Sequence, residues 1–384
     1  MWTIRLARLF RRVQVRECRT TGSSCRPRAP LGTRRLLDPS HVFEHNMWDH
    51  VEWTPAQEED ARRKVEEQAE EKLSVELQEL YDDEASEFWN GFYKIHENRF
   101  FKDRNWLFTE FPELLGGGIS HNIGVSCEAG FDRTAVPKEP LERLSGQNEF
   151  PERSDFPGSH TTLRIMEVGC GVGNTVFPIL QTNSDREVFI YCCDFSSAAV
   201  DLVKAHPDYD PKRCHAFVHD LCTDKSYPMA GGSLDIIILI FVLSSINPDK
   251  VLAAVKRLTQ LLRPGGLLLF RDYGRYDMAQ LRFKKGRCIA DNFYARGDGT
   301  RVYFFLPEEA ANMFSQAGLV QEQHLVDRRL QVNRGRQVTM YRVWIQSKFR
   351  KPLCPPHSSD DHRLHVNSSI SNSHGGTCTE SANR

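Results

Sequence analysis

The stretch from Leu163 to Asn174, LRIMEVGCGVGN, decides which fold this chain of 384 residues adopts. Its first half, Leu163–Val168, is a strand-like run. Its second half places Gly169, Gly171 and Gly173 just before a helical pattern. Glycine lets the backbone turn tightly and approach a ligand closely. A strand, a glycine bend and a helix in this order predict the first unit of a doubly wound α/β fold, with a ligand held at the bend.

Strand-like and helical patterns alternate after this bend. We expect strands at Leu163–Val168, Val188–Cys193, Cys214–Val218, Leu234–Phe241 and Leu267–Arg271. We expect helices at Thr175–Gln181, Ser196–Ala205, Asp249–Leu262 and Pro307–Ala317. This alternation predicts a parallel sheet with helices packed on it.

Two further strand-like segments, Leu319–Leu330 and Val338–Gln346, flank the turn signal Asn333-Arg334-Gly335. They predict an antiparallel hairpin at one edge of the sheet. The expected fold is therefore α/β and Rossmann-like, with a mostly parallel seven-stranded sheet and a terminal antiparallel hairpin, spanning residues 161–350.

Two carboxylates stand where such a fold holds a nucleoside. Asp194 ends the second strand, where it can accept hydrogen bonds from both ribose hydroxyls. Asp220 follows the third strand, where it can accept one from an adenine amino group. The turn LRPGG at 262–266 leads into the fifth strand, as is common in class I methyltransferases. The glycines follow the spacing GxGxG, whereas dinucleotide-binding loops place the third glycine one position later. We therefore expect S-adenosylmethionine (SAM) as the cofactor in preference to NAD.

Each of these residues also has a purely structural interpretation. Gly173 can serve helix packing, Asp194 can cap a helix, and Asp220 can close an Asx turn. Their joint placement at the carboxyl ends of successive strands favours a binding site.

The N-terminal residues 1–37 are rich in arginine and nearly free of acids. As a helix they place Trp2, Leu6 and Phe10 on one face and arginines towards another, which is typical of a mitochondrial targeting presequence. The alternative is a basic arm that binds RNA. We expect location in the mitochondrial matrix, with a cytoplasmic or nuclear location as the alternative.

The segment 38–114 predicts a helical extension. Thr54 has the position of an N-cap and Pro55 that of a first helical residue, opening a Glu-rich helical pattern that continues with breaks to about His96. Residues 115–160 are rich in Gly, Ser and Pro and predict a flexible linker, while residues 351–384 predict a disordered tail.

Composition bears on several classes of protein. No apolar run reaches the eighteen residues of a membrane span, so no membrane association is expected. A net charge of −1 hides a basic C-terminal half, which fits either a polyanion site or ordinary surface. The eleven cysteines include no CxxC pair, so we expect reduced thiols and no metal site. Cys192 and Cys193 are neighbours on an expected strand and should point to opposite faces.

At the level of longer motifs the sequence resembles the tRNA N3-methylcytidine methyltransferases of the methyltransferase-like family. The resemblance lies in FEHNMWD (43–49), FWNGFYKIHENRFFKDRNW (88–106), residues 163–194 and nearly all of residues 217–346, including RDYGRYDMAQLRF and GDGTRVYFF. The Arg-rich N-terminus and Ala29–Gly32 look closest to the mitochondrial paralogue.

The resemblance implies methylation of N3 of the cytidine at position thirty-two of tRNA anticodon loops. The cofactor residues that it carries over are Trp89, Tyr93, Gly169, Asp194, Asp220, Leu221 and Ile240; Gly171 and Gly173 belong with them by the glycine pattern. Trp89 and Tyr93, four residues apart on a helix, share a face and would close over the cofactor as a lid. Their alternative role is that of core aromatics.

The target N3 lies on the Watson–Crick edge, so the base must be unpaired or everted from its loop. We expect Asp272 to accept from the cytosine N4 amino group and Tyr273 or Phe293 to stack on the base. A structural ion pair between Asp272 and Arg275 is the alternative.

Cations from several segments are candidates for contacts with the anticodon stem. The set is Lys102, Arg104, Arg271, Arg275, Arg282, Lys284, Lys285, Arg296, Arg301, Arg328, Arg329, Arg334 and Arg336, with Tyr273 as a further RNA contact. The resemblance also implies a possible accessory protein such as seryl-tRNA synthetase. Two other functions stay open: methylation of a small molecule or protein, and a tRNA-binding adaptor without turnover.

Overall fold

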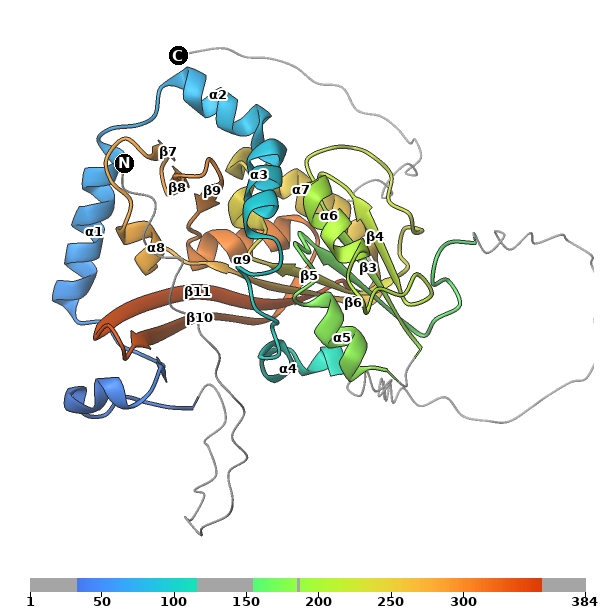
Figure 1. The fold of residues 1–384 in the computed structure, drawn as a ribbon, viewed down its shortest axis with the longest axis horizontal. Coiled ribbons are helices and arrows are strands. Elements are labelled where there is room, and N and C mark those ends of the chain that lie inside the picture. Colours follow the sequence, from blue (N-terminus) through green and yellow to red (C-terminus); the bar gives the residue numbers. More distant parts are fainter. Residues whose placement is uncertain (1–32, 116–154, 185–186, 354–384) are drawn as a thin grey trace, which may run out of the picture.

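The computed structural model describes residues 33–115, 155–184 and 187–353 (Figure 1). The expected presequence lies almost wholly outside these ranges, as do most of the expected linker and all but three residues of the expected tail.

A single large sheet organises the described part of the chain (Figure 1). Its parallel strands are β2 (Leu163–Val168), β3 (Val188–Asp194), β4 (Cys214–Val218), β5 (Leu234–Ile240) and β6 (Leu262–Tyr273). Next to β6 lies β11 (Val338–Arg350), antiparallel both to β6 and to β10 (Val320–Asn333). The order across the sheet is β1-β10-β11-β6-β5-β2-β3-β4. The expected mixed sheet with an antiparallel terminal hairpin is confirmed.

The strand at the far edge comes from the N-terminal extension. β1 (Met47–Asp49) pairs antiparallel with β10, with Trp48 opposite Leu330, and makes the sheet eight-stranded where seven strands were expected. Trp48 is buried against Leu330 and Val332. A second, three-stranded sheet of β7 (Cys288–Ala290), β8 (Phe293–Ala295) and β9 (Arg301–Tyr303) had no counterpart in the predicted elements.

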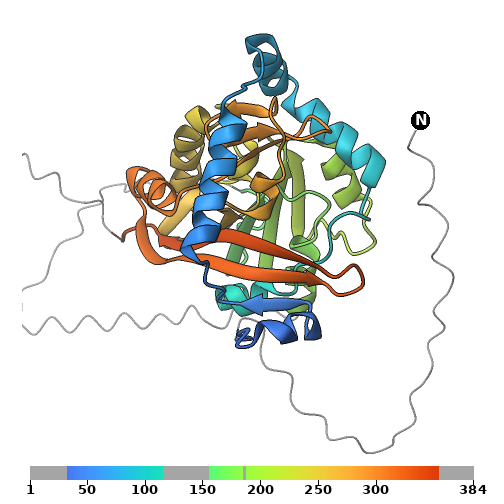
Figure 2. The ribbon, with the colours of Figure 1, turned by 90° about the vertical axis from the view of Figure 1, so that its left-hand side faces the viewer.

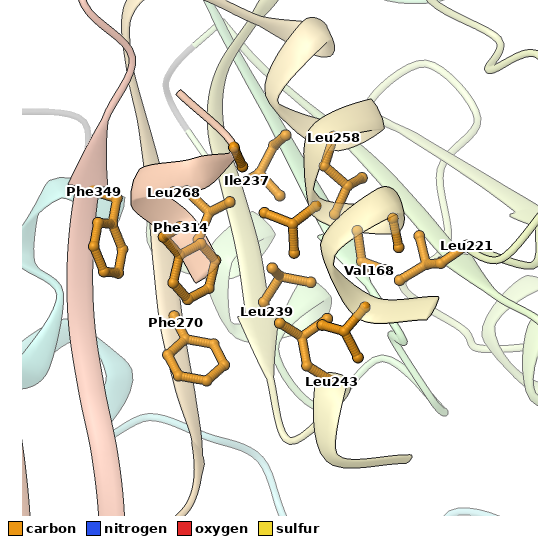
Figure 3. Close-up of a cluster of buried hydrophobic side chains, with 14 of the residues drawn as sticks. Val168, Leu221, Ile237, Leu239, Leu243, Leu258, Leu268, Phe270, Phe314 and Phe349 are labelled. Atoms are coloured by element: carbon orange, nitrogen blue, oxygen red, sulfur yellow. The ribbon is translucent and has the colours of Figure 1, made fainter. Parts of the chain in front are cut away.

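Both faces of the large sheet are covered. One face packs against α7 (Pro248–Leu261) and α9 (Pro307–Gln316); Figure 3 shows Leu258 of α7 and Phe314 of α9 beside Leu239 and Phe270 of the sheet. The other face packs against α5 (Val176–Thr182) and α6 (Ser197–Lys204). Cys192 and Cys193 lie in the two different clusters, as the alternation of a strand predicts.

The N-terminal extension packs as part of the same body. It comprises η1 (Pro39–Glu44), α1 (Pro55–Ala69), α2 (Val75–Asp83), α3 (Ala85–His96), α4 (Leu107–Glu110) and η2 (Pro112–Leu115). Thr54 caps α1 as expected, because its side chain accepts from the Gln57 backbone amide. The Gln57 side chain in turn accepts from the Thr54 backbone amide. Phe111 and Leu114 are fully buried in the cluster beneath α5.

The C-terminal end of the expected linker is packed against the sheet. The Tyr191 hydroxyl donates to the carbonyl of Pro157, and Phe156 packs on the core. Gly158 has φ +75° and lies against the ring of Phe189, so a side chain has no room there. The α/β body therefore includes residues from Phe156 onward.

Candidate functional site

The carboxyl ends of β2, β3, β4 and β5 meet at one edge of the sheet and surround a hollow that α2 and α3 cover (Figure 1). The hollow is lined by Asp82, Asp83, Ala85, Ser86, Trp89, Tyr93, Val168, Gly169, Asp194, Phe195, His219, Asp220, Leu221, Cys222, Phe241, Val242, Ser245, Ile246, Lys250 and Arg301. Of the residues predicted to bind a cofactor, the structure brings Trp89, Tyr93, Gly169, Asp194, Asp220 and Leu221 together here.

The glycine bend has the backbone that only glycine adopts readily. Gly169, Gly171 and Gly173 have φ values of +61°, +53° and +87°. A Cβ at Gly169 would stand 2.6 Å from Val242 Cγ2, and one at Gly171 would stand 2.8 Å from the Tyr93 hydroxyl. Gly173 instead lies against Phe177 of α5, which is the helix-packing role.

Asp194 ties the bend to the start of α6. Its Oδ2 accepts from the Gly171 amide and its Oδ1 from the Ser196 amide, both at 2.9 Å. Burial raises the pKa of Asp194 to about 6, against the opposing effect of these amide bonds. The carboxylate lines the hollow while it also holds the backbone that precedes α6, so its binding and capping interpretations are compatible.

Asp220 follows β4 and faces the same hollow. Its Oδ1 accepts from the Cys222 amide at 2.8 Å, which closes an Asx turn and fixes the carboxyl group. Leu221 beside it is buried and adds an apolar wall. His219, which the sequence did not single out, also lines the hollow, and its Nε2 is buried with no hydrogen-bond partner among the described residues.

Two aromatic side chains of α3 close the hollow from the extension. Trp89 and Tyr93 stack with ring centroids 5.8 Å apart, and burial followed by the charge of Asp194 raises the pKa of Tyr93 well above its usual value. Asn90 on the same helix accepts from the Ser196 hydroxyl at 2.7 Å. Helix α3 is thus bound to the residues that hold Asp194. Of its two aromatics, Tyr93 is buried and Trp89 is partly buried, and both form part of the pocket wall.

Ile240 differs from its expected placement. Its side chain is buried in the apolar cluster beneath the sheet, and the next residues, Phe241 and Val242, line the hollow. Phe241 has φ +59°, a left-handed conformation that turns the chain out of β5. The strand was predicted to end at Phe241 and ends one residue earlier, at Ile240, whose side chain points to the core because side chains alternate along a strand.

Residues from α2, α7 and β9 meet at the rim. Asp82 of α2 accepts from Lys250 of α7 at 2.7 Å and from Arg301 of β9. These contacts join segments far apart in the sequence, and no local pattern indicated them. The sequence showed only that Lys250 lies just after the start of a helix that follows β5, which does not identify its partner.

Asp272 is not placed to contact a substrate base. It is fully buried, its Oδ2 accepts from the Ser244 amide at 3.0 Å and its Oδ1 from the Tyr273 amide at 2.8 Å. Burial raises its pKa to about 6. The alternative ion pair with Arg275 is not present among the described residues, and both Asp272 oxygens are already used to fix the loops after β5 and β6.

Four of the cations expected to contact phosphate are paired with carboxylates instead; Arg271 and Arg301 are buried, and Arg104 and Arg329 are partly buried. Arg271 binds Asp327 at 2.5 Å and Gln346, Arg329 binds Asp327 at 2.8 Å and Glu110 at 2.7 Å, Arg301 binds Asp82, and Arg104 lies 3.5 Å from Glu167. A guanidinium held by carboxylates away from solvent has no free donors for a phosphate. These four expectations are corrected.

The other predicted RNA contacts are distributed as follows. Lys102 is exposed, and so are Arg282, Lys284, Arg334 and Arg336. Lys285 pairs with Glu70 and Arg328 with Glu58. Arg296 donates to Thr300 and to the Arg301 carbonyl. Tyr273 lies 5.0 Å from Phe241 between ring centroids, and Phe293 is buried under Arg301. Arg275 and Tyr276 border a separate hollow.

The site fits an adenosyl group. Gly169 has the left-handed backbone of a ligand-binding bend, two carboxylates stand at the ends of adjacent strands, and a stacked aromatic pair covers the amino-acid side of the hollow. Next to the bend, Glu167 Oε2 is buried with no hydrogen-bond partner among the described residues. Burial raises the pKa of Glu167 to about 7.

Comparison with known proteins gives a consistent set of relatives. Residues 166–268 match a family model described as a methyltransferase domain. A Danio rerio protein named tRNA N(3)-cytidine methyltransferase METTL2 is 58% identical over 332 residues, which is 85% of this chain and 91% of the relative. The human METTL2B of the same description is 54% identical over 357 residues, covering 85% and 94%.

A relative with a mitochondrial description is more distant. Human tRNA N(3)-cytidine methyltransferase METTL8, mitochondrial, is 45% identical over 267 residues, which is 60% of this chain and 92% of the relative. Among solved structures, a SAM-dependent methyltransferase from Methanosarcina mazei aligns with 50% of this chain and 92% of its own at 15% identity, with a TM-score of 0.38. A likeness at that level adds nothing to the fold described above.

Proposed function

Because the chain belongs to the tRNA N(3)-cytidine methyltransferase family, we propose that it transfers a methyl group from SAM to N3 of the cytidine at position thirty-two of the tRNA anticodon loop. The observation that carries the proposal is the meeting of Asp194 and Asp220 at adjacent strand ends beside the glycine bend, under the Trp89–Tyr93 pair.

The residues of the hollow divide the binding of the cofactor among them. Asp194 accepts from the ribose hydroxyls, and Asp220 accepts from the adenine amino group beside the apolar side chain of Leu221. Trp89 and Tyr93 exclude water from the methionine end. When bound, SAM supplies an electrophilic methyl group on its sulfonium.

The chemistry requires little from the protein beyond placement. N3 of neutral cytosine has a lone pair in the ring plane, and no proton has to leave before it attacks the methyl carbon. Rate enhancement then comes from holding the two reactants in line and away from water. This agrees with a hollow whose described residues include aromatic walls and fixed carboxylates but no nucleophile–base pair.

The acceptor base enters where the loops after β5 and β6 meet. Phe241 and Tyr273 stand there with ring centroids 5.0 Å apart, and Phe241 borders the cofactor hollow. Asp272 does not contact the base itself. It accepts from the Ser244 and Tyr273 amides and thereby positions these aromatic rings. We assign it a positioning role.

The test is to incubate the protein with SAM carrying a labelled methyl group and with total tRNA, digest the tRNA, and identify the labelled nucleoside. Label should appear in 3-methylcytidine at position thirty-two, and Asp194→Ala and Asp220→Ala proteins that stay folded should bind S-adenosylhomocysteine at least tenfold more weakly. Label in protein or metabolites with none in tRNA would reject the assignment. If supplying seryl-tRNA synthetase raises the rate, the proposed accessory partner gains support.

The proposed location is the mitochondrial matrix, supported by the arginine-rich residues 1–37 and by the relative described as mitochondrial. Residues 1–39 fused to a fluorescent reporter should bring it to mitochondria. A reporter that stays diffuse in the cytosol would favour the cytoplasmic alternative.

A further inference from the structure

A second hollow lies between the start of α1, the loop after β6 and the β10–β11 hairpin. Figure 2 shows α1 on one side of this hairpin and η1 on the other. The hollow encloses about 460 Å³, within the range of small-molecule sites, and shares no lining residue with the cofactor hollow. Its walls include Trp53, Arg275, Tyr276 and Arg328.

Two hydrogen-bond donors in this wall have no partner. Trp53 Nε1 and Arg275 Nε are both buried, and neither finds an acceptor among the described residues. A buried donor without an acceptor costs free energy, and native proteins rarely leave one unpaired without a functional reason. Two such donors on one hollow indicate a ligand that carries hydrogen-bond acceptors.

Arg275 differs from the other arginines around it. Arg62 binds Glu59 at 2.5 Å, and Arg328 lies 3.6 Å from Glu58. Within the described ranges Arg275 makes no ion pair. Its position is nevertheless fixed, because its amide donates to the Phe305 carbonyl at 2.9 Å. The structure therefore holds an uncompensated guanidinium at a set place on the wall.

Aromatic rings and guanidinium groups lie close together on the wall of this hollow. The Arg275 guanidinium lies 5.2 Å from the ring centre of Tyr276, and that of Arg328 lies 5.9 Å from the ring centre of Trp53. Tyr276 has φ +69°, a strained conformation for a tyrosine that such sites can retain for a purpose. Aromatic rings and guanidinium planes are what proteins use to stack unpaired nucleobases.

The loop between the two hollows connects them. Tyr273, whose ring stands beside Phe241 at the cofactor hollow, precedes Arg275 by two residues, and the Gly274 amide between them donates to the Val343 carbonyl at 2.9 Å. Two residues of extended chain span about 7 Å, which is close to the spacing of neighbouring nucleotides in an extended strand.

We infer that this hollow binds one unpaired nucleotide of the RNA substrate, a loop neighbour of the methylated cytidine, an inference that rests on the proposed function. The ring face of Trp53 stacks on its base, and Nε1–H, which lies in the ring plane, donates to a sugar oxygen beside the base. Arg275 donates to a base carbonyl or phosphate oxygen. Glu58 and Glu59 on the same wall repel a phosphate, so the nucleotide binds with its base towards them. Their carboxylate oxygens then accept hydrogen bonds from an exocyclic amino group of the base.

The experiment combines protein variants with RNA variants in binding measurements. A fluorescent stem-loop RNA containing the target cytidine is made as a series in which each other loop base in turn is removed, leaving the sugar and phosphate. Affinities are measured for the parent, Trp53→Ala, Trp53→Phe and Arg275→Ala proteins. One abasic position should weaken binding to the parent about tenfold, as expected for a lost stacking contact. With that abasic RNA, Trp53→Ala should weaken binding no further, because the base that Trp53 contacts is already missing.

The remaining variants separate the contributions. Trp53→Phe keeps a ring and removes the Nε1 donor, so it should lose less than Trp53→Ala, while Arg275→Ala should weaken binding about tenfold. Arg63→Ala removes the same charge from a neighbouring exposed position of α1 outside the hollow and is the matched control. Unchanged affinity for S-adenosylhomocysteine and an unchanged melting temperature show that each variant is folded.

Three outcomes would overturn the inference: losses that are additive at every loop position, an Arg63→Ala loss equal to that of Arg275→Ala, or parent protein that binds no RNA. Failure of the proposed function is read separately, from the absence of labelled 3-methylcytidine when the parent does bind the RNA. If the parent binds RNA tightly and the Trp53→Ala loss disappears at one abasic position, but no methylation occurs, the nucleotide site is supported and the proposed reaction is rejected.

Discussion

Replacing Gly171 with alanine tests whether helix α3 rests on the glycine bend. Gly171 has φ +53°, and a non-glycine residue there costs about 1–2 kcal/mol of folding free energy. The new Cβ would also stand 2.8 Å from the Tyr93 hydroxyl oxygen, and forcing such a contact in a packed region costs about 1–3 kcal/mol more. We expect Gly171→Ala to lower the free energy of unfolding by about 3 kcal/mol.

Removing one atom should recover part of this loss. In a Tyr93→Phe protein the hydroxyl is absent, and the next atom of the ring lies 3.5 Å from the Cβ position, an ordinary contact. Gly171→Ala should then cost only the backbone strain, about 1–2 kcal/mol. The measurement is urea unfolding of all four proteins followed by circular dichroism, repeated with S-adenosylhomocysteine present. Gly297→Ala, where nothing lies within 4 Å of the new Cβ, is the control.

The double-mutant comparison decides the matter. If Gly171→Ala costs the same in both backgrounds to within about 0.5 kcal/mol, Tyr93 does not touch the bend in solution, and α3 is not the cover that the structure describes.

Three further predictions concern charged residues. Because burial raises the pKa of Asp194 to about 6, affinity for S-adenosylhomocysteine should fall as the pH drops below about 6, and Asp194→Asn should bind weakly with no such pH dependence. For the free protein the sign is opposite: ionising this carboxyl is harder when folded, so its contribution to stability is lost as the pH rises from 3.8 to about 6, and calorimetry of the parent against Asp194→Asn measures it. Arg271→Ala should lower the free energy of unfolding by about 1.5–3 kcal/mol, since Asp327 keeps Arg329 but loses its hydrogen bond to Arg271, and a melting temperature near that of the parent would contradict this. Lys102→Ala should leave stability unchanged and reduce the salt dependence of tRNA affinity by about one unit of slope, which titrations between low and moderate salt would show or refute.

Local patterns in the sequence were sufficient for most of the α/β body. β2 and β4 have the predicted bounds, and β3, α5, α6, α7 and α9 differ by a residue or so at their ends. Each of these elements is specified by a short-range signal, such as alternation of burial, a capping residue or a glycine bend. The same holds for Asp194 and Asp220, whose sequence positions at strand ends placed them at one edge of the sheet.

Which other residues surround the site depends on contacts between segments that are distant in the sequence. Asp82, Lys250 and Arg301 come from three elements, and Tyr93 reaches Gly171 across the boundary between the extension and the sheet. A sequence pattern states which residues share one helix or strand. It does not state which partner lies opposite, because that depends on how the elements pack.

By itself the sequence determined the alternating strands and helices of the large sheet from β2 to β6, the glycine bend and the carboxylates beside it, because each depends on the conformational preferences of a few neighbouring residues. The tertiary structure decided which arginines are internal and paired with carboxylates and which are not. Arg271 and Arg275 are equally basic in sequence, but Arg271 lies on β6 opposite Gln346 of β11 and is buried against Asp327, whereas Arg275 lies past the strand end and has no carboxylate partner among the described residues. They are four positions apart in the sequence, and only the pairing of β6 with the hairpin determines which of the two is buried, because the free energy of a charge depends on what surrounds it in space.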